Sequence, residues 1–260
     1  MKRLMAIAFG ALSLLSACSP SDNDSEPITT ETDYFPEETG NFWVYKVSGT
    51  NFESGRDSLY VANDTIISGN SCKKFKTKTL PLGFYSNSAN NNSIRKVNDK
   101  IVLTGSAGLN FGEALPVDVS LTDFVIFKQS AVADEELDSE TGVIEQEFDG
   151  FPLTITYTLK TIAMGRLPNF TAPDQKSYSD ILKVKTILKL QITTDLGGLA
   201  VPVLRSQDVI TSTQYYSKNI GVVYANTTIT YNLEAIASTF GIPQTTTQTS
   251  EEVLDIYSVD

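Results

Sequence analysis

The stretch DILKVKTILKLQITT, residues 180–194, decides the fold class, because apolar and polar residues alternate along almost all of it. In a β-strand, residues at every second position share one face, so this pattern predicts a strand with one buried face and one solvent-exposed face. The strand would far exceed the usual length of about six residues, which favours a wide or strongly curved antiparallel sheet. The expected buried face comprises Leu182, Val184, Leu188, Leu190 and Ile192, and the expected wet face comprises Lys183, Lys185, Lys189, Gln191 and Thr193.

Similar strand patterns occur on both sides of this stretch. They are rich in β-branched and aromatic residues and are bounded by turn-forming residues. Segment 57–80 breaks at 63–64 and at 68–70, and segment 94–105 is predicted to form a hairpin around 98–99. We therefore expect an all-β fold of about ten to twelve strands, built as an antiparallel sandwich or as a strongly curved half-barrel sheet. The remaining predicted strands are 41–49, 123–132, 151–163, 203–217, 221–233 and a closing strand within 252–260.

Few segments depart from the strand pattern. Residues 232–240 are predicted to form one or two helical turns, and no other segment beyond residue 17 has helical periodicity. Polar loops are expected at 87–93 and 241–252, and the acidic run 134–149 is expected to be a solvated hairpin loop. No linker and no internal repeat stands out, so residues 34–260 are predicted to form a single β-rich domain.

The first 17 residues have the parts of an export signal. Lys2 and Arg3 give a cationic start, and the apolar stretch 4–15 is shorter than the roughly 20 residues that a membrane-spanning helix needs. Small residues follow, as they do at signal cleavage sites. Residues 1–17 are therefore predicted to be a removable signal peptide, and the alternative is an uncleaved anchor helix.

The end of this signal, Leu15-Ser16-Ala17-Cys18, is similar to the bacterial lipobox, which consists of an aliphatic residue, two small residues and a cysteine. The resemblance implies that the chain is cut before Cys18 and that the thiol of Cys18 is acylated, with palmitate as one of the chains. Two acyl chains already hold a protein stably at a membrane. The alternative is an ordinary signal followed by a chance cysteine.

A polar, acidic tract begins at this cysteine. Residues 18–33 lack the apolar surface needed to order themselves and are predicted to be a flexible tether. Residues 21–24 (SDND) resemble the surface-export signal of Bacteroidetes lipoproteins, which implies a lipid-anchored domain at the outer membrane that faces outward. The alternative is a solvated spacer on a protein that faces the periplasm.

Three further stretches extend this resemblance. YFPEETGNFWVYKVSG (34–49), DSLYVANDTIISGNSCKKFK (57–76) and TQYYSKNIGVVYANT (213–227) are similar to segments of a recurring class of Bacteroidetes outer-membrane lipoproteins. In that class, an N-terminal aromatic strand and a late strand ending in GVV bracket a β-rich domain. The resemblance implies a lipid-anchored antiparallel β domain and no particular activity.

Composition excludes several classes of function. With 20 Lys and Arg against 31 Asp and Glu, the formal net charge is −11, which repels nucleic acid and anionic membrane surfaces. The chain has no histidine, so Ser-His-Asp and Cys-His catalysis and the usual histidine-containing metal sites are excluded. Once Cys18 is acylated, Cys72 is the only thiol and no disulfide forms within the chain. We expect Cys72 to be packed inward rather than catalytic.

Several functions stay open on the sequence alone. The acidic run from Asp134 to Asp149 offers oxygen ligands for calcium, although its spacing does not fit an EF-hand loop. Paired carboxylates could hydrolyse glycans, and a curved sheet could carry an apolar ligand. We expect a non-enzymatic binding or scaffolding role without cofactor or metal. The expected partners are the membrane, through the lipid anchor, and a glycan, an apolar ligand or another surface protein.

Overall fold

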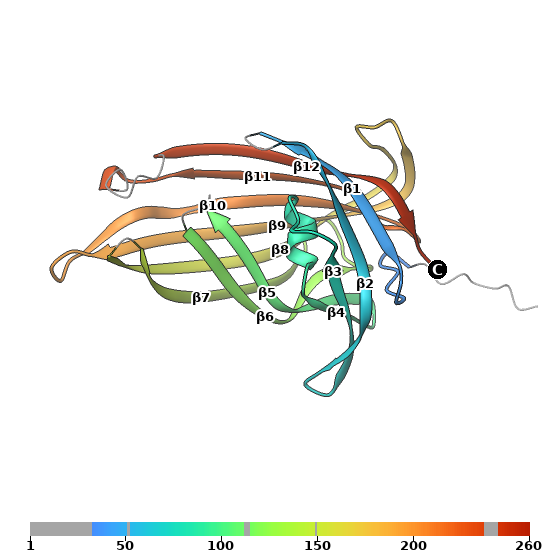
Figure 1. Cartoon of the computed structure of the whole chain (residues 1–260), viewed down its shortest axis with the longest axis horizontal. Coiled ribbons are helices and arrows are strands. Elements are labelled where there is room, and N and C mark those ends of the chain that lie inside the picture. The colour runs from blue at the N-terminus through green and yellow to red at the C-terminus, as the bar shows by residue number, and fades with distance from the viewer. Residues whose placement is uncertain (1–32, 51–52, 112–114, 149, 237–243) are drawn as a thin grey trace, which may run out of the picture. The chain divides into compact units, whose positions relative to one another are not determined.

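A computed structural model describes residues 33–50, 53–111, 115–148, 150–236 and 244–260. In this part of the chain, twelve antiparallel strands form one continuous sheet that curves until it is nearly closed (Figure 1). The predicted all-β, single-domain fold is confirmed. Of the two expected architectures, the strongly curved sheet forms and the two-sheet sandwich does not.

The strands follow one another around the sheet in chain order, except that the first strand pairs with the last. The order is β6-β5-β4-β3-β2-β1-β12-β11-β10-β9-β8-β7. Two meanders of six strands therefore meet where β1 pairs with β12, and β6 and β7 are the two ends of the order. The elements are β1 (Phe42–Gly49), β2 (Gly55–Ile67), β3 (Asn70–Thr77), α1 (Phe84–Ala89), β4 (Ser93–Val97), β5 (Lys100–Phe111), β6 (Leu115–Lys128), β7 (Glu136–Phe148), β8 (Phe151–Thr171), β9 (Ser177–Asp195), β10 (Ala200–Ser217), β11 (Gly221–Asn232) and β12 (Thr245–Ser258).

The alternation in residues 180–194 has the predicted outcome. Leu188, Leu190 and Ile192 are at most 2% exposed, whereas Lys189 and Gln191 between them are exposed. The strand that contains them, β9, pairs with β8 on one side and with β10 on the other. Its 19 residues let the sheet enclose a long interior.

Most of the acidic run 134–149, from Glu136 to Phe148, forms a strand, contrary to the prediction of a loop, whereas Asp134 and Glu135 lie in the turn before it. This strand, β7, pairs with β8 and lies at the end of the strand order. Most of its acidic side chains are exposed or half-buried. Charged side chains on an edge strand prevent it from pairing with another chain. The acidic residues that suggested a loop therefore protect an edge strand of the sheet. Asp149 lies outside the described residues.

Three other local predictions need correction. Residues 63–64 do not break β2, because they pair with Lys74 and Lys73 of β3 just after a bulge between Val61 and Asn63. The polar run 241–252 joins β12 from Thr245 on, since threonine suits an exposed strand surface as well as a loop. The polar stretch 87–93 contains the end of helix α1 and the start of β4. Of the helical turns predicted at 232–240, only a short 3-10 segment at Ala235 and Ile236 is seen, because Asn232 ends β11 and Leu233 forms a bridge with Leu204. Residues 237–240 lie outside the described residues.

The core fills the inside of the curved sheet. Its buried residues come from Tyr34 onward, and Tyr45, Leu59 and Ile155 are among those without contact to solvent. The chain from Asp33 on thus contains a complete hydrophobic core and meets the requirement for folding as an independent unit. Among the described residues, no helix is both long enough and apolar enough to span a membrane.

In the described residues, side chains rather than a strand ladder join the two ends of the sheet. The amide of Val125 on β6 donates to Oδ2 of Asp138 on β7, at 2.8 Å. The carbonyl of Val125 accepts a hydrogen bond from Oγ1 of Thr161 on β8, at 2.6 Å. An ion pair of 2.6 Å between Lys128 and Glu135 lies beside them. These contacts draw β6 towards β7 and β8 and bring the sheet close to closure.

Candidate ligand-binding site

A short helix lies inside the curve of the sheet (Figure 1). α1 has six residues and contacts β2, β3, β5 and β10. A helix of this length is unstable by itself in water, so its contacts with the sheet must hold it in place. Tyr85, Ser86 and Ala89 are its buried residues.

A buried carboxylate from the last strand caps the start of α1. Glu252 on β12 is 1% exposed. Its Oε2 accepts a hydrogen bond from the amide of Tyr85 at 2.7 Å, and its Oε1 accepts from the amide and the hydroxyl of Ser86 at 2.9 and 2.6 Å. An isolated helix leaves its first amides without partners. Glu252 satisfies two of them from a distant part of the chain, because Gly83 at the N-cap has no capping side chain.

A second buried carboxylate holds the residues just before the helix. Asp57 on β2 is 1% exposed. Its Oδ1 accepts from the amide of Leu82 at 2.9 Å, and its Oδ2 accepts from the amide of Gly83 at 2.8 Å. We call Asp57, Glu252 and the segment 82–86 that they bind the carboxylate clamp.

The clamp keeps two acidic groups out of water without a basic partner. In the described part of the chain, neither Asp57 nor Glu252 forms an ion pair. Burial raises the pKa of the Glu252 carboxyl to about 7; hydrogen bonds from Ser86 and Tyr85 oppose this rise, and the charge of Asp57 adds to it. Burial also raises the pKa of the Tyr45 and Tyr85 hydroxyls well above 10.0. Glu252 is therefore a member of the clamp that changes charge near neutral pH.

An uncharged side chain holds the other end of α1. Nδ2 of Asn92 donates to the carbonyls of Ser88 and Ser106, each at 2.7 Å. Oδ1 of Asn92 accepts from the amide of Ser106 at 2.9 Å. Asn92 thus ties the end of the helix to β5. Because an amide side chain does not titrate, this attachment does not depend on pH.

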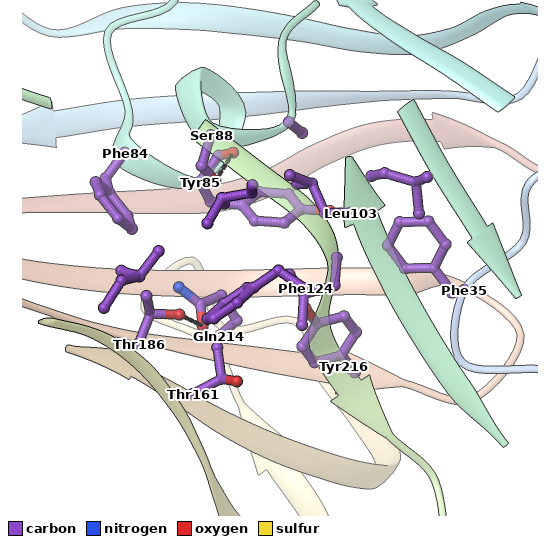
Figure 2. A pocket seen from close by; sticks show the side chains of 15 residues that line it. Phe35, Phe84, Tyr85, Ser88, Leu103, Phe124, Thr161, Thr186, Gln214 and Tyr216 are labelled. Atoms are coloured by element: carbon purple, nitrogen blue, oxygen red, sulfur yellow. Dashed lines mark hydrogen bonds between the residues drawn. The ribbon is translucent and has the colours of Figure 1, made fainter. Parts of the chain in front are cut away.

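An apolar cavity lies between α1 and the inner face of the sheet (Figure 2). Its volume is about 60 Å³, the space of roughly two water molecules. Eleven of its fifteen lining residues are aliphatic or aromatic, and none of the fifteen is charged. Phe84, Tyr85 and Ala89 of α1 form one wall, and residues of β4, β5, β6, β8, β9 and β10 contribute to the others.

Hydrogen-bonding groups gather on one side of the cavity. Gln214 on β10 is buried. Its Nε2 donates to Oγ of Ser212 at 2.8 Å, and its Oε1 accepts from Oγ1 of Thr186 at 3.4 Å. Figure 2 shows Gln214, Thr186 and Thr161 across the cavity from α1. Gln214 has two amide hydrogens, and its bond to Ser212 uses one of them.

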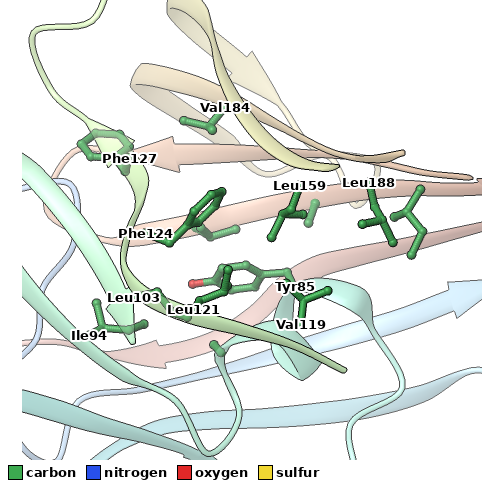
Figure 3. Close-up of a cluster of buried hydrophobic side chains, with 14 of the residues drawn as sticks. Tyr85, Ile94, Leu103, Val119, Leu121, Phe124, Phe127, Leu159, Val184 and Leu188 are labelled. Carbon is green, nitrogen blue, oxygen red and sulfur yellow. The ribbon is translucent and has the colours of Figure 1, made fainter. Parts of the chain in front are cut away.

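Tyr85 fills interior space that a larger ligand would need. Figure 3 shows its ring among side chains of the sheet, close to Leu121, Phe124 and Leu159. The ring also meets that of Tyr45 edge-on, with 5.7 Å between the centroids. The helix therefore acts as a plug inside the curved sheet. An outward movement of α1 would enlarge the cavity by the volume of this ring.

Of the residues singled out in the sequence, those that the structure describes do not line this cavity. Cys18, the predicted lipid-attachment residue, lies outside the described residues. Cys72 on β3 is 3% exposed, and burial raises the pKa of its thiol, as expected of a packed and unreactive cysteine. Of the acids proposed as calcium ligands, Asp134 and Glu135 precede β7, Asp149 lies outside the described residues, and the others lie along β7. Within the described ranges no three His, Cys, Asp or Glu side chains form a group that could hold a metal ion.

The residues that build the site are not among those predicted from the sequence. Asp57 shares the buried face of β2 with Leu59, and Glu252 shares the buried face of β12 with Leu254. An acid in phase with the apolar residues of a strand is the signal that could have identified both of them. Gln214 gives a related signal on β10, where an amide side chain lies in phase with Ile210 and Tyr216.

Comparison of the chain with protein-family models, with curated proteins and with solved structures found no match.

Proposed function

We propose that this protein is a non-enzymatic binding protein that holds a small, uncharged and mainly apolar molecule inside its curved sheet. The observation that carries the proposal is the cavity beneath α1, which is lined mostly by apolar side chains and by no charged one. Small-molecule sites are typically concave and apolar, with a few polar groups that orient the ligand. Among the possible binding roles, we therefore favour that of a carrier for an apolar ligand.

The volume of the cavity limits the ligand that enters the closed structure. A cavity of about 150 Å³ lined by aliphatic and aromatic side chains takes up benzene, whereas this one measures about 60 Å³. A molecule with a six-membered ring therefore needs α1 to move outward and to withdraw Tyr85 from the interior.

The polar side of the cavity indicates the chemistry of the ligand. Gln214 and Thr186 offer hydrogen bonds, so a molecule with one hydroxyl or carbonyl group on an apolar body is favoured over a pure hydrocarbon. A carboxylate is disfavoured, because no basic residue lines the cavity and a buried charge without a partner is strongly destabilising.

A comparison of three ring compounds tests the proposal on the fragment 33–260, after circular dichroism has established that it is folded. Phenol, toluene and benzoate have similar size and differ in polarity. We expect phenol to raise the melting temperature most, toluene less and benzoate not at all, because a ligand stabilises the state it binds. Calorimetric titration gives the corresponding affinities.

A cavity-filling variant locates the binding. Ala89→Val adds two carbons to the wall formed by α1, so we expect it to abolish the effect of phenol. Ala200→Val makes the same change at an exposed position of β10 and should bind as the wild type does. The proposal fails if none of the three compounds binds, or if Ala89→Val binds phenol as tightly as Ala200→Val.

The hydrolase alternative has less support. A glycosidase needs two carboxyl groups that face its substrate across a cleft. The acids of the clamp, Asp57 and Glu252, are buried and accept hydrogen bonds from backbone amides. They are engaged in holding α1 and do not face solvent.

We also propose that Cys18 is acylated and anchors the domain at the outer membrane, facing outward. The lipobox-like sequence that ends at Cys18 and the acidic tract 18–33 support this location. In cells fed labelled palmitate, Cys18→Ser should lose both the label and the membrane association of the wild type. Protease added to intact cells should remove the wild-type domain, and survival of that domain would contradict the outward orientation.

A further inference from the structure

We propose that the carboxylate clamp is a pH-dependent latch, which keeps α1 closed over the cavity in mildly acidic conditions and releases it as the pH rises. The latch rests on the proposed function, because it governs access to the same cavity. Phe84 and Tyr85 form a wall of the cavity, and the segment 82–86 that contains them is held by Asp57 and Glu252. A change at the clamp therefore acts directly on that wall.

The charges around Glu252 determine the direction of the effect. Asp57 is the acid that faces it from β2, and in the described residues no Lys or Arg pairs with either acid. Tyr45 on β1, Tyr85 on α1 and Tyr216 on β10 surround the same region, and burial raises the pKa of all three hydroxyls, which leaves them neutral. Amide dipoles and the hydroxyl of Ser86 are thus the groups that compensate an ionised Glu252.

The linkage between proton binding and closure follows from the burial of Glu252. In the closed state burial raises the pKa of Glu252 to about 7, and in an open state that admits water its pKa returns towards the ordinary 4.5. The closed state therefore binds the proton more tightly, so protonation favours closure. This preference is complete below pH 4.5 and is lost as the pH rises through 7. We expect the equilibrium constant for opening to rise by roughly fifty- to a hundredfold between pH 5 and pH 8.

The two ends of α1 respond differently to this change. Asp57 and Glu252 hold the start of the helix, whereas the neutral side chain of Asn92 holds its end. Release of the clamp therefore lets the segment 82–86 move while the end of the helix stays attached to β5. The helix would turn about its attachment at Asn92, and Tyr85 would leave the interior.

Hydrogen exchange in the ligand-free fragment 33–260 tests the latch. Mass spectrometry of peptides that contain residues 82–89 gives the protection of their amides, after division by the intrinsic rate at each pH. We expect protection in the wild type to fall by roughly fifty- to a hundredfold from pH 5 to pH 8, as the opening constant rises. Glu252→Gln removes the titration and should make the protection independent of pH. Glu251→Gln, a neighbouring change on the face bonded to Tyr224, should behave as the wild type.

Ser86→Ala provides a second test, which can be used even if the Glu252→Gln variant does not fold. The Ser86 hydroxyl stabilises the ionised form of Glu252, so its loss should shift the midpoint of the pH-dependent change in protection to higher pH. The latch is refuted by wild-type protection that stays constant from pH 5 to pH 8, by a pH dependence that persists in Glu252→Gln, or by an unchanged midpoint in Ser86→Ala. This experiment uses no ligand, so it tests the latch separately from the proposed function. If the protein fails to bind phenol but its protection still depends on pH as expected, the binding function is rejected and the latch is not.

Discussion

Gly83 approaches Glu252 so closely that no side chain fits between them. A Cβ added to Gly83 would lie 2.1 Å from the carboxyl carbon of Glu252 and 2.3 Å from its Oε1. The φ angle of Gly83 is −82°, which any residue adopts, so the constraint is one of space and not of backbone conformation. The absence of a side chain at Gly83 lets the backbone of α1 reach the carboxylate.

Gly83→Ala should therefore destabilise the protein by about 1 to 3 kcal/mol, the usual effect of an overpacked buried position. Denaturant unfolding measures the change. Glu252→Asp shortens the carboxylate side chain by one CH₂, so the double variant should be more stable than the sum of the two single changes predicts. Additive effects would show that Gly83 and Glu252 do not interact in this way.

Stability should fall as the pH rises from 5 to 8, because the folded state binds a proton at Glu252 more tightly than the unfolded state does. The pKa of about 7 against 4.5 corresponds to a loss of at most about 3 kcal/mol. Glu37, whose pKa burial also raises, acts in the same direction. Denaturant unfolding at several pH values should show that Glu252→Gln removes most of this slope, whereas Glu251→Gln leaves it intact. An equal slope in both variants would assign the effect to other groups.

Thr161→Val should weaken the closure of the sheet. The change preserves the shape of the side chain and removes the hydrogen bond from Thr161 Oγ1 to the carbonyl of Val125. A buried carbonyl left without a partner lowers the free energy of unfolding by about 1 to 3 kcal/mol. Thr156→Val, at an exposed position of the same strand, should be close to neutral in the same denaturant titration. Equal stabilities for the two variants would show that the bond at Val125 does not stabilise the fold.

Cys72 should react slowly with thiol reagents in the folded fragment 33–260, in which it is the only cysteine. Burial shields the sulfur and raises the pKa of the thiol, which lowers the fraction of reactive thiolate. The rate of reaction with a disulfide reagent should rise with denaturant as the protein unfolds. Ser71→Cys combined with Cys72→Ser places the thiol at an exposed neighbouring position and should react at once. Fast labelling of native Cys72 would contradict the packed role.

The strands were predictable where one face is buried and the other is wet. β9 is such a strand, and its two faces match the alternation in residues 180–194. The hairpin around 98–99 was predictable for a different reason, because Asn tolerates the φ of 56° that Asn98 adopts in the turn. Local sequence determines both features, so no knowledge of distant contacts is needed.

The site was not predictable in this way, because it depends on contacts between distant positions. α1 is too short to be recognised by periodicity, and it forms where Asp57 and Glu252 supply partners for its first amides. These acids lie on strands at opposite ends of the sequence, which become near neighbours through the pairing of β1 with β12. The same pairing joins the two meanders into one sheet. Because it cannot be read from local sequence, the sandwich and the curved sheet both remained possible.

The pairing of β1 with β12 also affects how the molecule is made. Phe42 lies opposite Ser258, so this junction cannot form until the ribosome has synthesised the chain as far as β12. Contacts between such distant residues make folding slow, because a very long loop must close first. The newborn polypeptide would therefore leave this junction open until β12 has emerged, and the inner faces of the two meanders would stay exposed to water until then.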